Sequence, residues 1–520
     1  MFSPMIGMDL LHRQYSAFVW LRLSSVLYMC VLLACLWCGK RVYMWMRAFW
    51  ILRTAPKPPQ RWTFSLVFEV WESISRMDPG LKVTAKIFNY LQSKFNEVLD
   101  HDLTVVYFGL QPFLLGITPD TVEAILTNSQ NLNKPFLYNM LKPWVGTGIL
   151  TSDKDQWKTK RKAITPAFHF KILDDYVPVM NRRALLLMRR LRTRDLGKYI
   201  DALPVIRKAA FGILFETVLG VEIEEDELER NGLLEVNDEI AESIMTRMLN
   251  VFQWPDFLYN LSKDARHFRH RVNYFRKYCE NVYQKKKANY DRTTPKKSFM
   301  DILLRMHMED KTITEDQVRD EVSTIFIGGF DTTATAAAFM LHLLGNHPRV
   351  QEKLREEIDS VFGRDKERSV TPADIKQMKY LDCVLKEALR LYPPAPVVAR
   401  MIDEDFKIGK QTIPSGTVAL VTIYFLHRHP RFYYRPNDFI PERFLEQKER
   451  HPFMYVPFSG GSRNCLGQRF SLQEDKILLT YILRWFKVES KLPSKDLQLS
   501  LELILRPVQG LEVKFTPRDE

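Results

Sequence analysis

The segment that most restricts what this chain can fold into is a glycine-rich turn around one cysteine, Phe458-Ser-Gly-Gly461-Ser-Arg463-Asn-Cys465-Leu-Gly467, followed by a long helical pattern. A cysteine at a helix start meets backbone N–H groups and the positive helix end, and both favour a thiolate. The glycines permit a close approach of another group. A buried structural cysteine in a turn is the alternative, but the ten-residue spacing favours a ligand site.

A second informative segment lies upstream, in an apolar run from Glu321 to about Pro348 that predicts a long helix. Gly328 and Gly329 interrupt it at a cost of about 1 kcal/mol each, which invites a functional explanation. The Thr332 hydroxyl can bond back to a carbonyl one turn earlier. We expect this helix to leave room for a small reactant, although a kinked helix with a local polar pair would show the same pattern.

A third segment combines an acid and two bases. Glu387 and Arg390 are one helical turn apart and can pair, and Arg443 follows in Phe439-Ile-Pro-Glu-Arg443-Phe. An ordinary surface ion pair is the alternative for Glu387 and Arg390 alone.

Taken together and in this order, the three segments resemble the haem-binding loop, the oxygen helix and the E-x-x-R helix of the cytochrome P-450 superfamily. The resemblance covers nearly the whole chain. It implies the P-450 fold, a mainly α structure with small β-sheets (α+β), and a haem b whose iron is ligated by the Cys465 thiolate. It also implies a monooxygenase that inserts one oxygen atom of O2 into a lipophilic substrate.

The same resemblance assigns roles to single residues. Asp331 and Thr332 would relay protons during oxygen activation. The resemblance also implies that Glu387, Arg390 and Arg443 form a buried, charge-compensated triad that supports the haem side of the core. The residues expected to bind or border the haem, besides Cys465 as metal ligand, are Phe458, Gly461, Arg463, Gly467, Trp157, Arg161, Arg400 and Gly329.

Further details favour family 4 of the superfamily, namely Thr151-Ser152, the segment from Thr165 to Leu173, and His427-Arg-His-Pro430. Many relatives in that family carry a glutamate in the oxygen helix that esterifies a haem methyl group. Gly328 occupies the matching position here. We therefore expect no covalent haem ester, and the family's preference for terminal hydroxylation of fatty acids is weakened.

An uncharged apolar stretch runs from Leu23 to Cys38. Together with the apolar residues just before it, this stretch is long enough to cross a bilayer as a helix. Basic residues crowd its C-terminal side, starting at Lys40, which favours a cytosolic location for the remainder. We expect residues 1–60 to form a membrane anchor with a Pro-rich linker, and residues 61–520 to form the haem-thiolate domain facing the cytosol at the endoplasmic reticulum. A cleaved signal peptide is the alternative.

Electron supply must come from another protein, because no glycine-rich nucleotide loop follows a strand and Gly146-Thr-Gly148 is too short to count. The resemblance implies an NADPH-cytochrome P-450 reductase, with cytochrome b5 as a second expected partner. The net charge of +13 suits a membrane or an acidic protein, and no nucleic-acid module is present. Four lysines, at 154, 158, 160 and 162, are candidates for the reductase contact, with a merely solvated helix face as the alternative.

The expected pocket walls are apolar: Ile325, Phe326, Ile327, Val397, Val398 and the loop from Phe136 to Trp144. They predict a lipophilic substrate without separating fatty acids, hormones and xenobiotics. Two other functions share Cys465. An isomerase or dehydratase of peroxides would not need the pair Asp331 and Thr332, and a haem-based gas sensor would need neither this pair nor an apolar pocket.

Two local patterns complete the expected fold. An amphipathic helix should begin at Pro348 and end at Gly363. Alternating leucines from Leu497 to Leu503, a turn, and the stretch from Leu511 to Phe515 predict a terminal hairpin.

Overall fold

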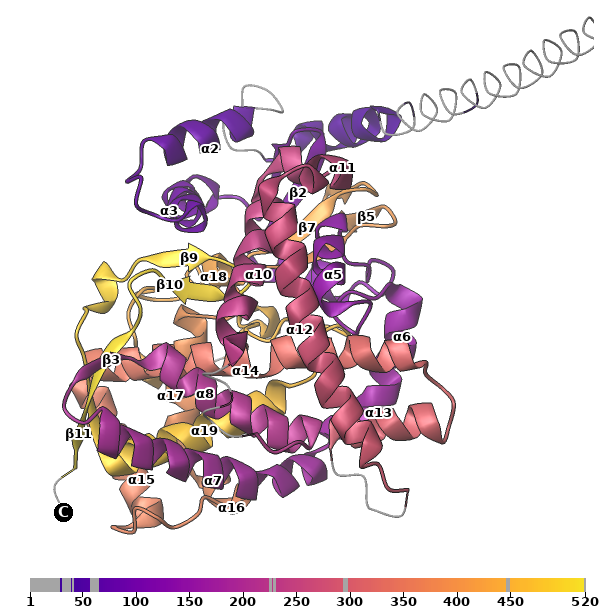
Figure 1. Cartoon of the computed structure of the whole chain (residues 1–520). Helices are drawn as coiled ribbons and strands as arrows, with labels where there is room; N and C mark the ends of the chain where they lie inside the picture. Colours follow the sequence, from indigo (N-terminus) through magenta and orange to yellow (C-terminus); the bar gives the residue numbers. More distant parts are fainter. Residues whose placement is uncertain are drawn as a thin grey trace, which may run out of the picture.

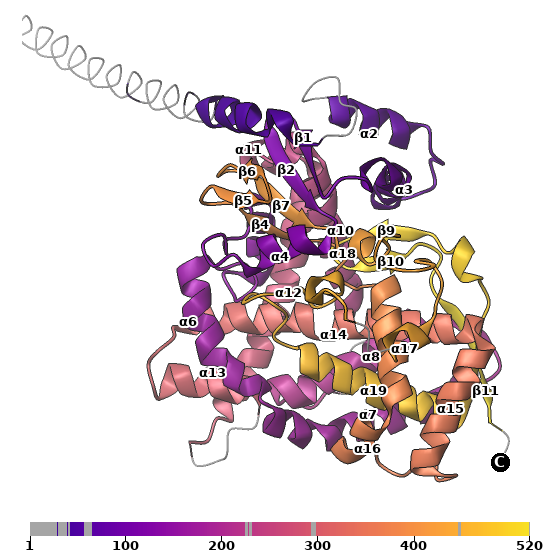
Figure 2. The same cartoon turned by 180° about the vertical axis from the view of Figure 1, so that it is seen from behind.

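The computed structural model describes residues 29, 39, 42–56, 65–223, 227, 231–292, 298–445 and 449–518. Helices make up most of it, and the strands form small sheets, so the expected mainly α fold is confirmed (Figures 1 and 2). The expected anchor from Leu23 to Cys38 lies outside the described residues, apart from Met29.

The helices, in chain order, are α2 (Ser65–Ser75), α3 (Val83–Phe95), α4 (Pro119–Thr127), α5 (Lys142–Val145), α6 (Lys154–Ile164), α7 (Phe170–Arg194), α8 (Ala202–Leu214), α10 (Leu233–Leu249), α11 (Asp256–Asn260), α12 (Lys263–Ala288), α13 (Phe299–Met308), α14 (Glu315–Asn346), α15 (Pro348–Phe362), α16 (Pro372–Gln377), α17 (Lys379–Leu391), α18 (Ile423–Leu426) and α19 (Gln468–Trp485). The strands are β1 (Leu103–Phe108), β2 (Gln111–Gly116), β3 (Tyr199–Asp201), β4 (Val398–Met401), β5 (Phe406–Ile408), β6 (Gln411–Ile413), β7 (Val418–Val421), β8 (Phe486–Ser490), β9 (Leu499–Leu501), β10 (Leu505–Pro507) and β11 (Glu512–Pro517).

The central element is α14, the long helix that the sequence predicts. A capping box starts it, in which Gln317 N donates to Thr314 Oγ1 and Thr314 N donates to the Gln317 side chain. It ends at Asn346, two residues before Pro348. Within the described residues, α14 is the one helix long and apolar enough to span a membrane, and the protein buries 72% of its most apolar window. It is therefore the core helix.

Two further helices match the sequence expectations. α15 begins with Pro348 at its first turn and is closed by Gly363, which has a φ of +62°. α19 follows the cysteine loop directly, from Gln468 to Trp485, and packs against α14 and α7. The cysteine therefore sits at the N-terminal end of a helix that lies against the core.

The larger sheet has the order β1-β2-β7-β4, with β2 and β7 parallel and the other pairs antiparallel. It lies beside the short hairpin β5-β6, on the side of the molecule where residues 42–56 dock (Figure 1). In this segment Leu52 is fully buried, and Val105 N donates to Pro56 O over 2.9 Å. The sheet region therefore includes contacts from before residue 57.

The terminal hairpin is paired differently from the expectation. β9 pairs with β10 as an antiparallel hairpin, whereas β11 joins β8 and β3 in a separate three-stranded sheet. The alternation around Leu499 and Val513 correctly predicts strands. It cannot reveal that Val513 and Phe515 bury their side chains beside β8, because strand pairing depends on distant parts of the chain.

Candidate functional site

A cavity of about 710 Å3 lies between α14 on one side and the cysteine loop with the start of α19 on the other. This volume falls within the usual range of about 300–1,000 Å3 for small-molecule and cofactor sites. Most of its lining is apolar. The residues singled out from the sequence in the cysteine loop and in α14 therefore border one common space.

The cysteine loop closes on itself through backbone contacts. Cys465 N donates to Phe458 O over 2.9 Å, and Asn464 N donates to Gly461 O over 3.3 Å. Gly461 has a φ of +67°, and a Cβ there would stand 2.0 Å from Leu126 O. A side chain at this position would be strained and would collide with the backbone, so the turn requires glycine.

The Cys465 side chain is accessible from the cavity, while protein surrounds it on its other sides. Burial raises the pKa of the Cys465 thiol, and the Gly467 N–H and the Arg161 guanidinium act in the opposite direction. The two Nη atoms of Arg161 donate to Asn464 O and Oδ1, both over 2.8 Å. Arg161, which the sequence assigns to the haem, therefore also fixes the loop that carries the sulfur.

Arg400 and Arg463 border the cavity, and neither guanidinium uses all of its N–H donors. Arg400 is 1% exposed and Arg463 is 8% exposed, and each makes a single hydrogen bond, to Ala399 O and Ser152 O respectively. Two donor nitrogens of each guanidinium have no partner among the described residues. Burial, and then Arg400, lowers the pKa of Arg463 to about 10. Unpaired buried cations of this kind require an anion.

Trp157 and Lys134 complete this cationic end of the cavity. Arg463 stacks over the ring of Trp157, a residue of α6, at 4.8 Å, a contact that the sequence does not reveal. Lys134 was missed by the sequence reasoning. Its Nζ lies 4.6 Å from the Tyr138 ring centre, and burial, with Arg400 and Arg463, lowers its pKa well below the ordinary value. A single lysine in an irregular loop carries no spacing that would have revealed it.

This excess of positive charge fits the two carboxylates of a haem. The flat space next to it fits as well, because a Cβ on Gly467 or on Gly328 would meet no atom within 4 Å. We expected Gly328 and Gly329 both to leave room in the cavity, but Gly329 does not. A Cβ there would stand 2.4 Å from Leu214 Cδ1, so Gly329 permits the close packing of α8 on α14.

Thr332 and Asp331 both line the cavity on α14. Thr332 Oγ1 donates to Gly328 O over 2.9 Å, one turn earlier, which is the contact that the sequence predicted. The helix nevertheless continues without a break through this position. Thr332 therefore presents a hydroxyl to the cavity directly beside the open surface of Gly328.

Asp331 is 2% exposed and engaged by two arginines that the sequence reasoning did not identify. Arg506 Nη2 lies 2.5 Å from Asp331 Oδ2, and Arg207 Nε lies 3.0 Å from Oδ1. Burial opposes ionisation of Asp331, but the two guanidinium groups outweigh it and hold its pKa below the ordinary value. Asp238 pairs with both arginines, so the four side chains form a closed ionic network.

The structure brings Glu387, Arg390 and Arg443 together. Arg390 donates to both Glu387 oxygens over 2.8 Å, and Arg443 Nε donates to Oε1 over 2.9 Å. Glu387 and Arg390 are fully buried. The remaining Arg390 donors reach three backbone carbonyls, including His427 O, and so tie α17 to the loop that precedes the cysteine segment.

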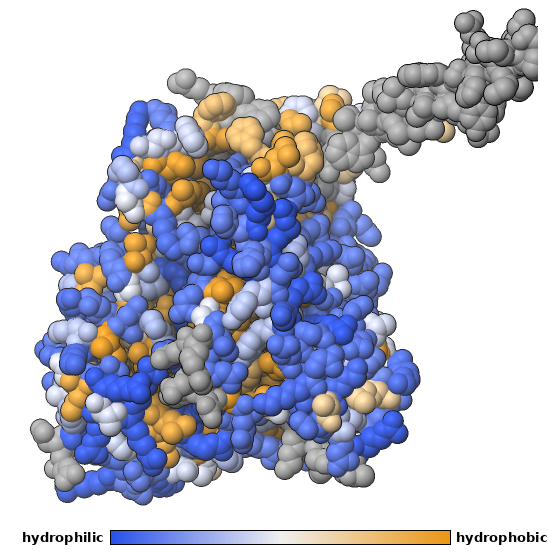
Figure 3. All heavy atoms as spheres, in the orientation of Figure 1, coloured by the Kyte–Doolittle hydropathy of each residue, from blue (hydrophilic) through white to orange (hydrophobic). Residues whose placement is uncertain are grey.

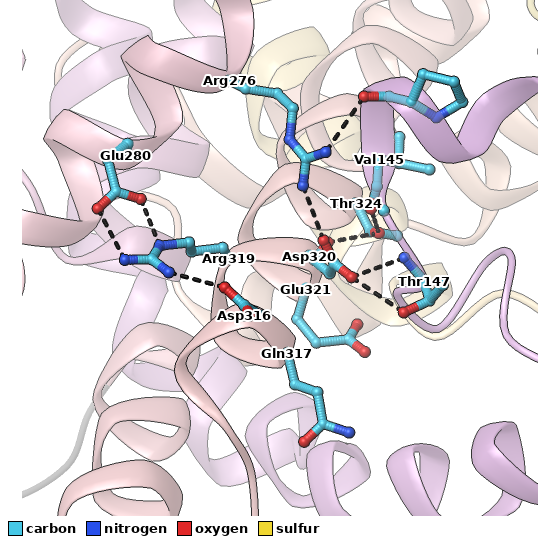
Figure 4. Close-up of polar contacts among 12 residues, drawn as sticks. Val145, Thr147, Arg276, Glu280, Asp316, Gln317, Arg319, Asp320, Glu321 and Thr324 are labelled. Atoms are coloured by element: carbon cyan, nitrogen blue, oxygen red, sulfur yellow. Dashed lines mark hydrogen bonds and ion pairs between the residues drawn. The ribbon is translucent and has the colours of Figure 1, made fainter. Parts of the chain in front are cut away.

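A polar clamp holds the loop after α5 onto α14 (Figure 4). Asp320 accepts hydrogen bonds from Thr147 N and Oγ1, and Arg276 of α12 donates to its other oxygen over 3.0 Å. A Cβ on Gly146 would stand 1.7 Å from Asp320 Oδ1, and one on Gly148 would stand 2.0 Å from Thr324 Oγ1. These glycines therefore serve helix packing.

Lys160 corrects one sequence expectation. It was grouped with three other lysines of α6 as a contact for a reductase, but it is only 8% exposed. Its Nζ lies 3.2 Å from Glu321 on α14 and donates to Thr147 O. Lys158 and Lys162 are exposed on the same helix. The reason is the helical periodicity, which directs Trp157, Lys160 and Ile164 inward.

The apolar walls are mostly as the sequence suggests: Ile325, Ile327, Val397, Val398, Leu137, Tyr138, Leu141 and Trp144 border the cavity. Phe326 does not. It is 1% exposed and its ring contacts Phe211, Phe215 and Phe275 at centroid distances of 5.2, 5.5 and 5.0 Å. Successive residues on a helix point about 100° apart, so Phe326 faces away from the cavity while its two neighbours face it.

Comparison with known proteins agrees with this geometry. The family model described as Cytochrome P450 matches residues 71–515. Cytochrome P450 4c3 of Drosophila melanogaster is 37% identical over 436 residues, which are 80% of this chain and 82% of the relative. Cytochrome P450 4V2 of Mus musculus is 36% identical over 84% of this chain and 86% of its own length, and the Homo sapiens protein of that name is 34% identical over 80% and 82%.

These relatives and the matched family model imply a haem cofactor, dioxygen, a redox partner and a lipophilic substrate. The cavity between α14 and the cysteine loop is the place where such a haem fits. The chain belongs to the cytochrome P450 family, close to its family 4 members, and is a haem-containing monooxygenase.

Proposed function

We propose that this protein is a haem-thiolate monooxygenase that inserts one oxygen atom of O2 into a lipophilic substrate, with electrons from a separate NADPH-dependent reductase. One observation carries the proposal. The Cys465 sulfur faces a mainly apolar cavity, opposite the Gly328 surface and beside two arginines that each have two buried donor nitrogens without a partner among the described residues.

The bound haem would supply the iron that activates dioxygen, with the thiolate as electron-donating ligand. Cys465 provides that thiolate just before the start of α19, where the Gly467 N–H and Arg161 favour the thiolate form. Arg400, Arg463 and Lys134 would neutralise the propionates, and Trp157 would support them by stacking under Arg463. Phe458 contributes the carbonyl that fixes Cys465 N.

Proton delivery falls to α14. The Thr332 hydroxyl lies at the cavity surface beside Gly328, where it would hold a proton ready for a reactant in the cavity. Asp331 can take part only after one of its two ionic contacts opens, because Arg506 and Arg207 occupy its oxygens. We therefore assign Thr332 the direct role and Asp331 the role of a gated proton relay behind it.

The haem is proposed to be bound without a covalent ester. Gly328 stands where many family 4 relatives have the esterified glutamate, and it offers no carboxylate. Glu321 lies about two helical turns before Gly328 on α14. Its carboxylate pairs with Lys160 and accepts a hydrogen bond from Ile149 N over 3.0 Å. Neither position supplies a free carboxylate to a haem methyl group.

We propose that residues 1–60 contain the membrane anchor and linker, that residues 61–520 form the catalytic domain on which residues 42–56 pack, and that the protein lies in the endoplasmic reticulum membrane facing the cytosol. An apolar surface supports this arrangement. It covers the end of the molecule where residues 42–51 and α2 lie (Figure 3). Its exposed side chains are Tyr43, Met46, Trp50, Phe68, Trp71, Phe252, Phe257, Leu258 and Leu261.

The electron donor is proposed to be an NADPH-cytochrome P-450 reductase, with cytochrome b5 as an additional donor. α6 contacts the cysteine loop through Arg161, so its exposed residues lie on the outer side of the haem ligand. Lys158 and Lys162 are exposed there and provide positive charge for an acidic partner.

Reconstitution with a reductase and a panel of lipophiles tests this function. We expect hydroxylated products that depend on NADPH, on O2 and on the reductase. Product formation from peroxides without an electron donor would instead identify an isomerase or dehydratase. Ligand binding at the haem without any product would identify a sensor.

A further inference from the structure

One wall of the cavity is formed by a single face of α10. The α10 residues that border the cavity are spaced as on one helical face: Asn237, Ala241, Met245, Met248 and Leu249. Four of these five are apolar. Asn237 is the one polar side chain on this face.

Asn237 is 1% exposed, and its Oδ1 has no hydrogen-bond partner among the described residues. A buried amide without a partner lowers stability, so packing alone does not explain an asparagine here. The neighbouring Asp238 does not border the cavity and pairs with Arg207 and Arg506. Asn237 is therefore available to a molecule inside the cavity.

A second hydrogen-bonding group lies nearby. Glu502, in the loop between β9 and β10, also borders the cavity and is 7% exposed. The charges of Asp238 and Glu242 on α10 act on it, which places it near this helix. Burial raises the pKa of Glu502 despite Lys82 and Arg506. Ser500 Oγ donates to its Oε1 over 3.3 Å.

The charge balance at this corner argues against an anionic ligand. Arg207 and Arg506 are already neutralised by Asp331 and Asp238. Lys82 is half exposed and lies 2.8 Å from Glu242 and 3.8 Å from Glu502, so two acids already share its charge. The cavity-lining arginines whose donors lack a partner in the described part of the chain, Arg400 and Arg463, lie on β4 and in the cysteine loop, where they fit the haem. A carboxylate placed beside Glu502 would meet a second acid without a compensating charge.

We propose that Asn237 and Glu502 form a subsite for the hydroxyl or carbonyl group of an otherwise apolar substrate, which makes neutral oxygenated lipophiles, and not fatty-acid carboxylates, the preferred substrate class. This inference rests on the proposed function and specifies its substrate. The amide of Asn237 can donate to or accept from either group, and the long apolar face of α10 covers the remaining chain.

Binding of three probes with twelve carbons tests the subsite: 1-dodecanol, dodecane and dodecanoate. Each is titrated into the purified full-length holoprotein, and the dissociation constant is read from the change of the haem absorption spectrum. Asn237→Leu should weaken 1-dodecanol about tenfold, the loss expected for one buried hydrogen bond, and leave dodecane within about twofold. Met245→Leu on the same face is the matched control and should change the dissociation constants of 1-dodecanol and dodecane by the same factor, because this side chain offers no hydrogen bond.

Asn237→Ala is measured in parallel, in case the larger side chain disturbs folding. Equal effects of both Asn237 variants on 1-dodecanol and dodecane would overturn the subsite, and so would dodecanoate binding that is tighter than that of 1-dodecanol and depends on Asn237. The proposed function is judged separately on the same samples. A wild-type protein without a thiolate-type spectrum in the reduced carbon monoxide complex would defeat that function first, whereas a normal spectrum with failed discrimination defeats the subsite alone.

Discussion

Thr332 shows how one side chain combines a structural and a chemical role. Its hydroxyl donates to Gly328 O and lies at the cavity surface, next to the position without a side chain. The adjacent Thr333 is buried and donates to Ser471 Oγ over 3.1 Å, which links α14 to α19. Replacing each of these two neighbouring threonines in turn can therefore distinguish the loss of a proton-delivering hydroxyl from the loss of a packing hydroxyl.

Replacing Thr332 by alanine should uncouple the reaction. We expect NADPH consumption to continue with release of hydrogen peroxide, while product per NADPH falls by about tenfold or more, because the positioned proton donor is lost. Peroxide, NADPH and product are measured in the reconstituted system. Thr333→Ala is the control and should remain coupled. Full coupling in Thr332→Ala would remove Thr332 from the mechanism.

His427 links the triad region to the segment before the cysteine loop. Its Nε2 accepts a hydrogen bond from Val456 N over 2.9 Å, and it is fully buried. Burial, followed by the charges of Arg390 and Arg428, lowers its pKa from 6.5 to about 3. The folded protein therefore requires the neutral imidazole.

This pKa predicts a loss of stability in mild acid. Between pH 6.5 and about 3, the unfolded chain binds a proton at His427 that the folded protein excludes, so stability falls as the pH decreases through this window. At pH 5.5 the loss from this group is about 1.4 kcal/mol. His427→Gln, which can still accept from Val456 N, should show a correspondingly flatter dependence in denaturant unfolding between pH 7 and 5.5. An unchanged slope would contradict the assignment.

At the scale of elements, α17 is fixed by the triad of Glu387, Arg390 and Arg443. The two hydrogen bonds from Arg390 and the one from Arg443 leave the Glu387 carboxylate fully compensated in a fully buried position. Removing the acid would leave two buried cations without a partner. Such a change is costly even where an intact buried ion pair contributes little.

Glu387→Ala should therefore destabilise the holoprotein by about 3–5 kcal/mol and reduce its haem content. Urea unfolding and the haem-to-protein ratio measure both effects. Glu352→Gln on α15 is the matched control, because it breaks an i,i+3 pair with Arg355 in which the acid is 58% exposed. It should change stability by less than about 0.5 kcal/mol. Equal effects of the two variants would refute the structural role of the triad.

The open surface of α14 at Gly328 gives a test of haem attachment. We expect the haem of the native protein to separate from the polypeptide in denaturing chromatography, since no free carboxylate faces the haem from this position. Gly328→Glu should be tolerated, because a Cβ there meets no atom within 4 Å, and it supplies the missing carboxylate. Haem that stays attached to the native chain would contradict the prediction.

Elements with a strong local pattern could be predicted from the sequence. α14, α15 and α19 follow from apolar periodicity, and α15 also from its end signals Pro348 and Gly363. The triad and Cys465 follow from spacing. The pairing of β11 with β8, the inward direction of Lys160, and the partners of Asp331 could not be predicted, because they depend on contacts between distant segments.

At the scale of the whole molecule, the cavity extends towards the end of the protein that carries the apolar surface. The exposed aromatic residues Trp50, Phe68 and Trp71 belong to the end where residues 42–51 and α2 gather (Figures 1 and 3). The cavity extends towards this end, since α2 and α3 contribute Glu69, Val70 and Lys94 to its lining. A lipophilic substrate could therefore enter from a membrane that contacts this surface.

Membrane attachment can be tested by extraction. We expect the full chain to stay in the membrane pellet in alkaline carbonate, because an apolar helix through Leu23–Cys38 would anchor it independently of charge. Removal of residues 1–41 should allow salt or carbonate to release the protein while its haem spectrum is retained. Release of the full chain by carbonate would show that the proposed anchor does not span the bilayer.

The central claim is the bond between the Cys465 sulfur and a haem iron, and the absorption spectrum of the reduced carbon monoxide complex tests it most directly. The full-length protein, shown to be folded, should display the strongly red-shifted Soret band of a thiolate-ligated haem. Cys465→His should bind haem without that band. A folded native protein that lacks the red-shifted band would contradict the proposed function.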